Sequence, residues 1–126
     1  MRQSKRDPEE LLPLSLSVFH ILLSLADQER HGYGIMKETA ARTDGKVRLG
    51  PGILYGNIKR LIEDGLIEKS QERPDPELDD ERRRYYRLTQ FGQRVVVAET
   101  RRLANLIGMA RSKRLLSDLK FADNLR

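Results

Sequence analysis

The chain has 126 residues, with 24 lysines and arginines against 19 aspartates and glutamates, which gives a formal charge of +5. This length suits one compact domain with or without an arm, and the basic excess favours polyanionic partners without specifying a fold. The absence of cysteine excludes disulfide bonds and thiolate metal sites, and no apolar stretch approaches the ~20 residues that cross a bilayer. Since no apolar signal core follows Met1, we expect a cytoplasmic protein with no membrane partner.

A first helix is predicted after a polar N-terminal arm, which we expect to be flexible over residues 1–12. Apolar residues then recur at steps of three and four, the spacing of one buried helix face. They are Leu14, Val18, Ile21, Leu22 and Leu25. Either Ser15 or Ser17 can cap the start of this helix, and the polar residues 27–30 mark its end.

Two further helices complete a three-helix unit. The second opens at residues 31–34, which include two glycines, and ends at Asp44-Gly45. The third begins with Pro51, because a proline in the first turn loses no helical hydrogen bond. Its apolar stripe consists of Leu54, Ile58, Leu61 and Ile62. Gly65 then supplies a residue suited to a left-handed helix cap.

A β-hairpin is predicted next. Residues 66–69 and 84–88 are the strand candidates, the second with aromatic and arginine side chains. Between them, residues 71–81 hold two prolines and a dense run of acids, which cannot pack into a core. The pattern therefore predicts two strands joined by a long, charged tip.

A long final helix is predicted from Thr89, its candidate cap, to about residue 116. It carries an apolar stripe with heptad-like spacing, which the rest of the fold need not cover. The stripe consists of Val96, Leu103, Leu106, Ile107 and Ala110. Residues 117–126 either extend this helix or form a tail. The predicted fold is mainly α with a small β-hairpin, in the α+β class.

Catalytic and metal-binding chemistry has little support. His20 and His31 lie on different elements without a third ligand, and the acidic residues 75–81 lack the spaced oxygens and the glycine of a calcium loop. Gly50 and Gly52 do not lead into the Lys-Ser/Thr of a phosphate-binding loop. We therefore expect no enzymatic activity, no metal and no cofactor.

DNA binding fits the order of elements better, because the second helix of a helix–turn–helix lies in the major groove. Opposite its apolar stripe, the third helix presents Gly52, Ile53, Gly56, Asn57, Lys59 and Arg60, with Tyr55 at the border. An asparagine can pair with adenine, and lysine or arginine can reach phosphate or guanine. The alternative is an ordinary basic surface beside a tyrosine that only packs.

Three arginines where the hairpin tip rejoins the second strand support the same hypothesis. Arg82, Arg83 and Arg84 can bind backbone phosphate or enter the minor groove. The neighbouring acids can instead neutralise them, or the acidic tip can cover the arginines until DNA displaces it.

These motifs, taken together, resemble the PadR family of bacterial transcriptional regulators. The matching segments are residues 31–35, 50–55, 61–67 and 84–89, with Gly92 after them. The resemblance spans roughly residues 14–110 and implies a winged helix–turn–helix. It places Tyr33, Tyr55, Lys59 and the arginines at 82–84 at positions of DNA contact. Ile53 stands where the family commonly has threonine, and Asn57 where a small residue is usual, so Asn57 is a candidate specificity residue.

The resemblance also implies an assembly and a mechanism. Residues 13–88 would form the DNA-binding domain and residues 89–126 a dimerisation helix and tail. A two-fold homodimer would set two reading helices about 34 Å apart on an inverted-repeat DNA operator. The implied function is repression by a protein that joins the nucleoid when bound, with release by a small aromatic effector. The alternatives are a winged-helix protein–protein adaptor and a basic RNA-binding module, although the latter lacks an aromatic stacking platform.

Overall fold

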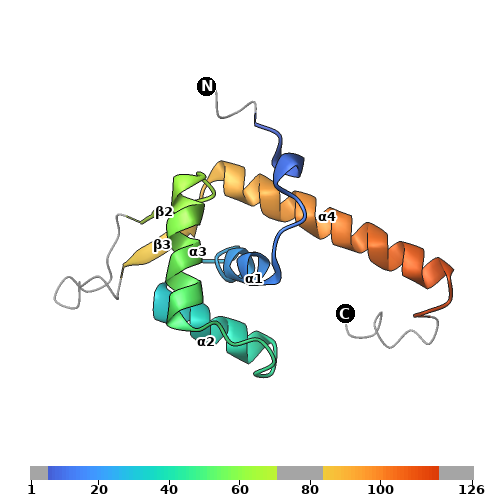
Figure 1. Ribbon diagram of the computed structural model, residues 1–126, viewed down its shortest axis with the longest axis horizontal. Coiled ribbons are helices and arrows are strands. Elements are labelled where there is room, and N and C mark those ends of the chain that lie inside the picture. Colours follow the sequence, from blue (N-terminus) through green and yellow to red (C-terminus); the bar gives the residue numbers. More distant parts are fainter. Residues whose placement is uncertain (1–5, 71–83, 117–126) are drawn as a thin grey trace.

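The computed structural model describes residues 6–70 and 84–116, and it is mainly helical (Figure 1). The elements in chain order are η2 (Pro8–Leu11), α1 (Leu16–Ser24), β1 (Arg30–His31), α2 (Gly32–Arg42), α3 (Pro51–Glu63), β2 (Ile67–Lys69), β3 (Tyr85–Leu88) and α4 (Gln90–Ser112). Helices α1, α2 and α3 group together beside the strands, and α4 extends away from them as an arm. The predicted fold class is confirmed. No helix within the described ranges combines the length and the apolar character that crossing a membrane requires.

The helix ends follow local signals in the sequence. Ser15 caps α1, since its Oγ accepts a hydrogen bond from the Val18 N–H at 3.1 Å. Thr89 caps α4 in the same way, with its Oγ1 2.9 Å from the Gly92 nitrogen. Pro51 is the first residue of α3, and Gly65 follows that helix with a φ of 82°, as a left-handed cap requires.

The core lies between the three grouped helices, the sheet and the first half of α4. Its fully buried apolar side chains include Ile21 and Leu22 of α1, Ile35 of α2 and Leu54 of α3. The predicted stripe of α3 is confirmed at Leu54, Ile58 and Leu61, which are all buried, while Ile62 is half-buried. Burial of one face of α3 leaves its other face to solvent.

The sheet has three antiparallel strands in the order β1-β3-β2. The predicted hairpin forms with Ile67 opposite Leu88 and Lys69 opposite Tyr86, and we call β2 and β3 the wing. The two-residue strand β1 was not predicted. It forms because Arg30 and His31 pair with Tyr86 and Tyr85 of β3, a strand that is adjacent in the sheet but distant in the sequence. The local sequence gives no signal for this pairing. The tip, with Arg82 and Arg83, lies outside the described residues.

The N-terminal segment differs from the predicted flexible arm. Residues 8–11 form the 3₁₀ helix η2, whose cap is Asp7, with Oδ1 3.0 Å from the Glu9 nitrogen. The helix packs against α4, and Leu11 and Leu12 lie against the core. The packing of this segment on α4 was not predicted because its first ten residues are polar. The two leucines that contact the core stand at the end of the predicted arm.

Helix α4 begins where predicted, after Thr89, but it departs from the prediction at Val96 and at its C-terminal end. Val96 was assigned to an uncovered stripe, yet it is buried with Phe91 and Val95 in the core of its own chain. The helix ends at Ser112 and not near residue 116, and Arg114 then takes a positive φ of 69°. The distal half is left exposed, with Leu106 at 45% and Met109 at 61% of full exposure.

Candidate nucleic-acid interface

The outer face of α3 is open along its first two turns. Ile53 is 56% exposed, and Lys59 and Arg60 are exposed further along the helix. A Cβ placed on Gly52 or Gly56 would meet no atom of residues 6–70 and 84–116 within 4 Å. This face is therefore thin and unobstructed, so that a bulky partner can approach the helix backbone closely.

Asn57 is half-buried and already hydrogen-bonded. Its Nδ2 donates to the carbonyl oxygen of Ile53, one turn back, at 3.0 Å. Asn57, the predicted specificity residue, therefore lies at the open face of α3. The bond to the Ile53 carbonyl engages one of the two Nδ2 hydrogens, and the other hydrogen and Oδ1 have further hydrogen-bonding capacity.

Tyr55 packs α3 against α2. Its ring lies across the backbone of Gly32, so that a Cβ on that glycine would sit 2.7 Å from the tyrosine Cζ. Gly32 is buried for this reason, and Tyr55 is half-buried. The sequence left open whether Tyr55 packs or contacts DNA. The structure shows that it packs, and part of its side chain is still accessible.

A strip of aromatic and basic side chains runs beside α3 from α2 to the wing. We define it by Lys37, Tyr33, His31, Tyr85 and Arg84. Tyr33 is 58% exposed, and its ring stacks on that of His31 with the ring centroids 6.4 Å apart. The Nζ of Lys37 lies 5.3 Å from the centroid of the Tyr33 ring. The ring of His31 meets Tyr85 edge-on at 5.2 Å.

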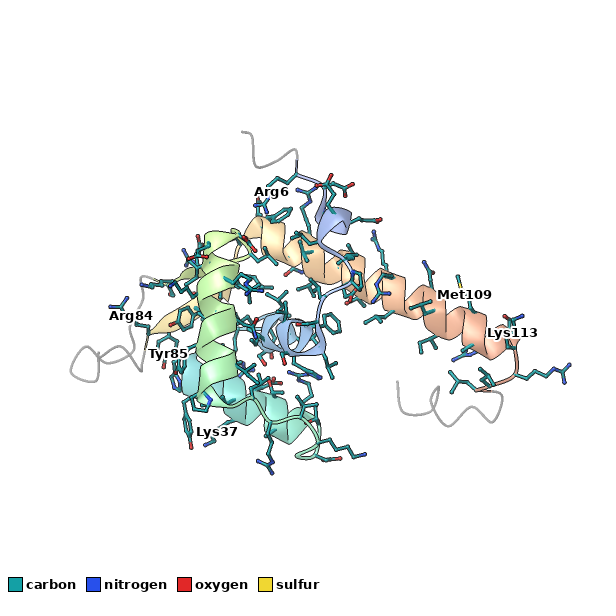
Figure 2. The ribbon with its side chains drawn as sticks, in the orientation of Figure 1. Arg6, Lys37, Arg84, Tyr85, Met109 and Lys113 are labelled. Atoms are coloured by element: carbon teal, nitrogen blue, oxygen red, sulfur yellow. The ribbon has the colours of Figure 1, made fainter. Side chains whose placement is uncertain are left out.

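Figure 2 shows three members of this strip, Lys37, Tyr85 and Arg84, at one edge of the molecule, far from Met109 and Lys113 at the end of α4. Tyr33 and Arg84 were predicted from the sequence as DNA contacts, whereas His31, Lys37 and Tyr85 were not. The signal for Lys37 was its position four residues after Tyr33, on the same side of α2. No comparable signal existed for Tyr85, because its neighbours depend on the pairing of β1 with β3.

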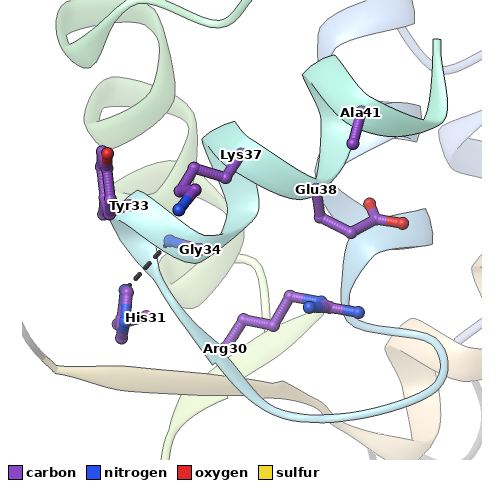
Figure 3. Close-up of a pocket in the computed structure, with 7 residues that line it drawn as sticks. All are labelled: Arg30, His31, Tyr33, Gly34, Lys37, Glu38 and Ala41. Carbon is purple, nitrogen blue, oxygen red and sulfur yellow. Dashed lines mark hydrogen bonds between the residues drawn. The ribbon is translucent and has the colours of Figure 1, made fainter. Parts of the chain in front are cut away.

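A groove of about 580 Å³ lies along the α2 end of the strip (Figure 3). Tyr33 and Lys37 come from α2, and His31 and Arg30 come from β1, where the His31 Nδ1 accepts the Gly34 N–H at 2.9 Å. The carboxylate of Glu38 also lines the groove. It is bound by Arg42 at 2.7 Å, and that hydrogen bond holds the pKa of Glu38 below its ordinary value.

Glu38 therefore does not neutralise Lys37, and Arg30 has an acid of its own, since its Nη2 lies 3.4 Å from the Asp27 carboxylate. Arg30 is fixed by a hydrogen bond from its Nε to the Ser24 carbonyl at 2.6 Å. Lys37 remains the adjustable charge, since its ammonium group rests only on the ring of Tyr33 among the contacts of the described residues.

The wing is held in place by polar contacts at its base. The Oγ of Ser70, just after β2, donates to Glu29 at 2.7 Å. Arg87 of β3 binds Glu68 at 2.9 Å and lies 3.7 Å from Glu29. These contacts tie the wing to the segment before β1.

Both histidines form contacts within the fold. The Nδ1 of His20 lies 3.0 Å from Arg42, and burial, followed by the charge of Arg42, lowers the pKa of His20. His31 is the N-cap of α2. Across residues 6–70 and 84–116, no group of three or more candidate ligands that could hold a metal ion is found.

The sequence profile described as "Transcriptional regulator PadR-like family" matches residues 21–98, which extend from α1 into α4. The chain belongs to the PadR-like family of transcriptional regulators. The members of this family bind DNA and are not enzymes. The open face of α3 and the strip thus belong to a winged helix–turn–helix of a DNA-binding regulator.

Individual relatives of this PadR-like chain agree with that assignment. It is 34% identical over 87 residues to the Transcriptional regulator Rv3488 of Mycobacterium tuberculosis, over 69% of this chain and 75% of the relative. The structure of H. salinarum RosR in the hsRosR-S4 complex is similar with a TM-score of 0.64 and 25% identity, over 95% of this chain and 100% of that one. A transcriptional regulator from Clostridium thermocellum, Cth-833, shares the fold at a TM-score of 0.61 and 23% identity, over 75% of this chain and 89% of that one.

Proposed function

We propose that this PadR-like protein is a homodimeric repressor that binds an inverted-repeat operator in double-stranded DNA. The observation that carries the proposal is the open face of α3, where Ile53 is 56% exposed and no atom of the described residues lies within 4 Å of a Cβ placed on Gly52 or Gly56. A helix with such a face can enter the major groove and bring its side chains to the base edges.

In this proposal, some side chains of α3 contact base edges, and the basic side chains of α3 and of the strip bind the DNA backbone. Ile53 contacts a thymine methyl group, and Asn57 pairs with adenine through Oδ1 and one Nδ2 hydrogen. Lys59, Arg60 and Arg84 bind phosphates, which adds affinity without sequence preference. Tyr33 and Lys37 follow the same backbone at the α2 end of the strip.

The distal half of α4 supports the homodimer. Leu106 and Ile107 are exposed there, while Leu103 and Ala110 are half-buried. Leu16 of α1 is also 65% exposed. Pairing of these apolar side chains with a symmetry mate removes them from water, and the two-fold axis sets both α3 helices on one face of the duplex.

The proposed mechanism is occlusion of the promoter by the bound dimer. Release follows when a small aromatic effector binds between the terminal helices, against Leu103, Leu106 and Ile107. The effector acts only through different affinities for the free and DNA-bound arrangements of the dimer. This part of the proposal is supported by the family resemblance.

The test begins with selection of genomic fragments by the purified protein, followed by binding titrations at several salt concentrations. We expect the logarithm of the affinity to fall with the logarithm of the salt concentration by roughly 0.9 per phosphate neutralised. Lys59→Ala weakens all duplexes alike, whereas Asn57→Ala relaxes preference at one base position. A protein that enriches no fragment, and binds duplex without salt dependence or not at all, is an adaptor and not this repressor.

A further inference from the structure

The strip carries three aromatic rings, whose flat faces have no role in the proposed binding of duplex DNA. Tyr33, His31 and Tyr85 follow one another along it, with centroid distances of 6.4 Å and 5.2 Å between neighbours. The local sequence does not show that these rings meet, because Tyr85 reaches His31 only through the pairing of β1 with β3. Folding therefore assembles an aromatic surface from distant segments.

The ring of Tyr33 is the most accessible of the three. Tyr33 is 58% exposed, whereas His31 and Tyr85 are half-buried. Lys37 lies on the side of the Tyr33 ring that is turned toward α2, as Figure 3 shows. A ring that is exposed beside a cation offers a flat, electron-rich face on which another planar group can stack.

Cations stand at both ends of this aromatic series. Lys37 follows Tyr33 along α2, and Arg84 precedes Tyr85 at the start of the wing (Figure 2). Within residues 6–70 and 84–116, Lys37 has no acidic partner, since Glu38 is bound by Arg42. Aromatic rings between positive side chains are the combination that binds an unpaired strand, with its bases on the rings and its phosphates at the cations.

The geometry of the rings favours an unpaired strand over a duplex. The Tyr85 ring is turned by 80° from that of His31, while the Tyr33 ring is within 12° of it. Bases in B-DNA are parallel and about 3.4 Å apart along each strand, so neighbouring bases cover their faces. Only bases that have separated and turned from one another can cover Tyr33 and Tyr85 at once.

We propose that the strip also binds single-stranded nucleic acid. One base stacks on Tyr33 and another on Tyr85, while the phosphates of the same strand lie at Lys37 and Arg84. The open face of α3 takes no part, because an unpaired strand has no major groove. This activity does not rest on the proposed operator binding, and either one can fail without the other.

The experiment is a fluorescence anisotropy titration of the full-length protein against an end-labelled 10-mer of thymidine at low salt. The matched ligand is an abasic 10-mer, which carries the same phosphates and no bases. We expect the thymidine strand to bind about fivefold or more tightly, the gain expected when one base stacks on an aromatic side chain. A uridine 10-mer is the second arm, and the tighter of the two strands identifies DNA or RNA as the source.

Variants of Tyr33 connect this preference to the strip. Tyr33→Ala should abolish the preference for the strand with bases, whereas Tyr33→Phe, which keeps the ring, should retain it. Both variants are expected to fold, because Tyr33 is exposed. Lys113→Ala, at the far end of α4, is the control for charge and leaves the preference unchanged.

Equal affinities for the thymidine and abasic strands would overturn the proposal, because they would show binding through phosphates alone. Absence of binding to every 10-mer would overturn it as well. A preference that survives Tyr33→Ala would place the stacking site elsewhere and contradict the assigned surface.

Discussion

At the scale of single residues, Gly92 and Gly56 both lie inside helices, but only Gly92 is packed against another segment. Substitution of the two glycines therefore tests this packing. A Cβ on Gly92 would overlap the carbonyl oxygen of Leu66, whereas one on Gly56 would meet open space. We predict that Gly92→Ala lowers the free energy of unfolding by about 2 kcal/mol or more, because backbone must move. Gly56→Ala is the control, and it raises the same quantity by about 0.5 to 1 kcal/mol through its better helix propensity. Urea unfolding measures both, and equal effects of the two substitutions would contradict the packing described.

Glu99 of α4 is a buried acid that ties together segments distant in sequence. It is 2% exposed, and its carboxylate accepts hydrogen bonds from the Leu14 N–H at 3.1 Å and from the Arg102 Nε at 2.6 Å. The hydrogen bond from Arg102, aided by that from Leu14, holds the pKa of Glu99 below its ordinary value. The charged carboxylate is thus favoured in the folded protein.

We predict that Glu99→Gln lowers the free energy of unfolding at neutral pH by about 1 to 3 kcal/mol, since an amide satisfies only part of these donors. A lowered pKa in the folded state adds stability above the ordinary carboxyl pKa, and this stability is lost as the pH falls through the folded value. The difference between wild type and variant should therefore shrink from pH 7 to about pH 3.5. A difference that stays constant over this range would contradict the assigned charge state.

At the scale of elements, our proposal makes α2 part of the DNA-binding surface, through Tyr33 and Lys37 of the strip. We predict that Lys37→Ala weakens binding to operator and to unrelated duplex by the same factor, and reduces the salt slope by about one. Lys113→Ala, a lysine at the far end of α4, serves as the matched control and changes neither quantity. Salt-dependent titrations measure both, and a loss of affinity restricted to the operator would show that Lys37 reads bases instead.

The elements themselves were predictable where their signals are local. The spacing of Leu54, Ile58 and Leu61, with Pro51 before them and Gly65 after them, determined α3 almost to its end residues. Strand β1 was missed because its two residues become a strand only by pairing with Tyr85 and Tyr86, more than fifty positions away.

The same distinction explains what the sequence left open at the candidate site and what it mispredicted in α4. The positions on the open face of α3 followed from helical spacing alone, and the structure places them there. The packing of Tyr55 on Gly32 and the burial of Val96 depend on contacts between distant elements. Heptad-like spacing indicates an apolar stripe, but it cannot tell which of its residues the chain covers by itself.

At the scale of the whole molecule, the N-terminal segment attaches the first half of α4 to the helical group. Arg6 stacks on Phe91, η2 packs on α4, and the Leu14 N–H binds Glu99. The first half of α4 is therefore built into the DNA-binding domain, and only its distal half projects. In a dimer, the angle between the two projecting halves sets the distance between the two α3 helices.

We predict a dimer at micromolar concentration in sedimentation velocity. The double variant Leu106→Ser with Ile107→Ser should sediment as a monomer and keep its helical circular dichroism, because both side chains are exposed in the single chain. Val97→Ser is the control. Val97 is also exposed, at 37%. It precedes Leu106 by nine residues, which is two and a half helical turns, so it lies on the opposite side of α4 from Leu106. A wild-type monomer, or a dimer that survives the double substitution, would contradict the assigned interface.

The central claim is that the open face of α3 lies in the major groove, once per subunit. Protection of guanine N7 from dimethyl sulfate on a selected operator tests it most directly, because N7 is exposed only in that groove. The account predicts two protected clusters with centres one helical turn apart, about 10 base pairs. A bound operator whose guanine N7 atoms stay fully reactive would contradict it.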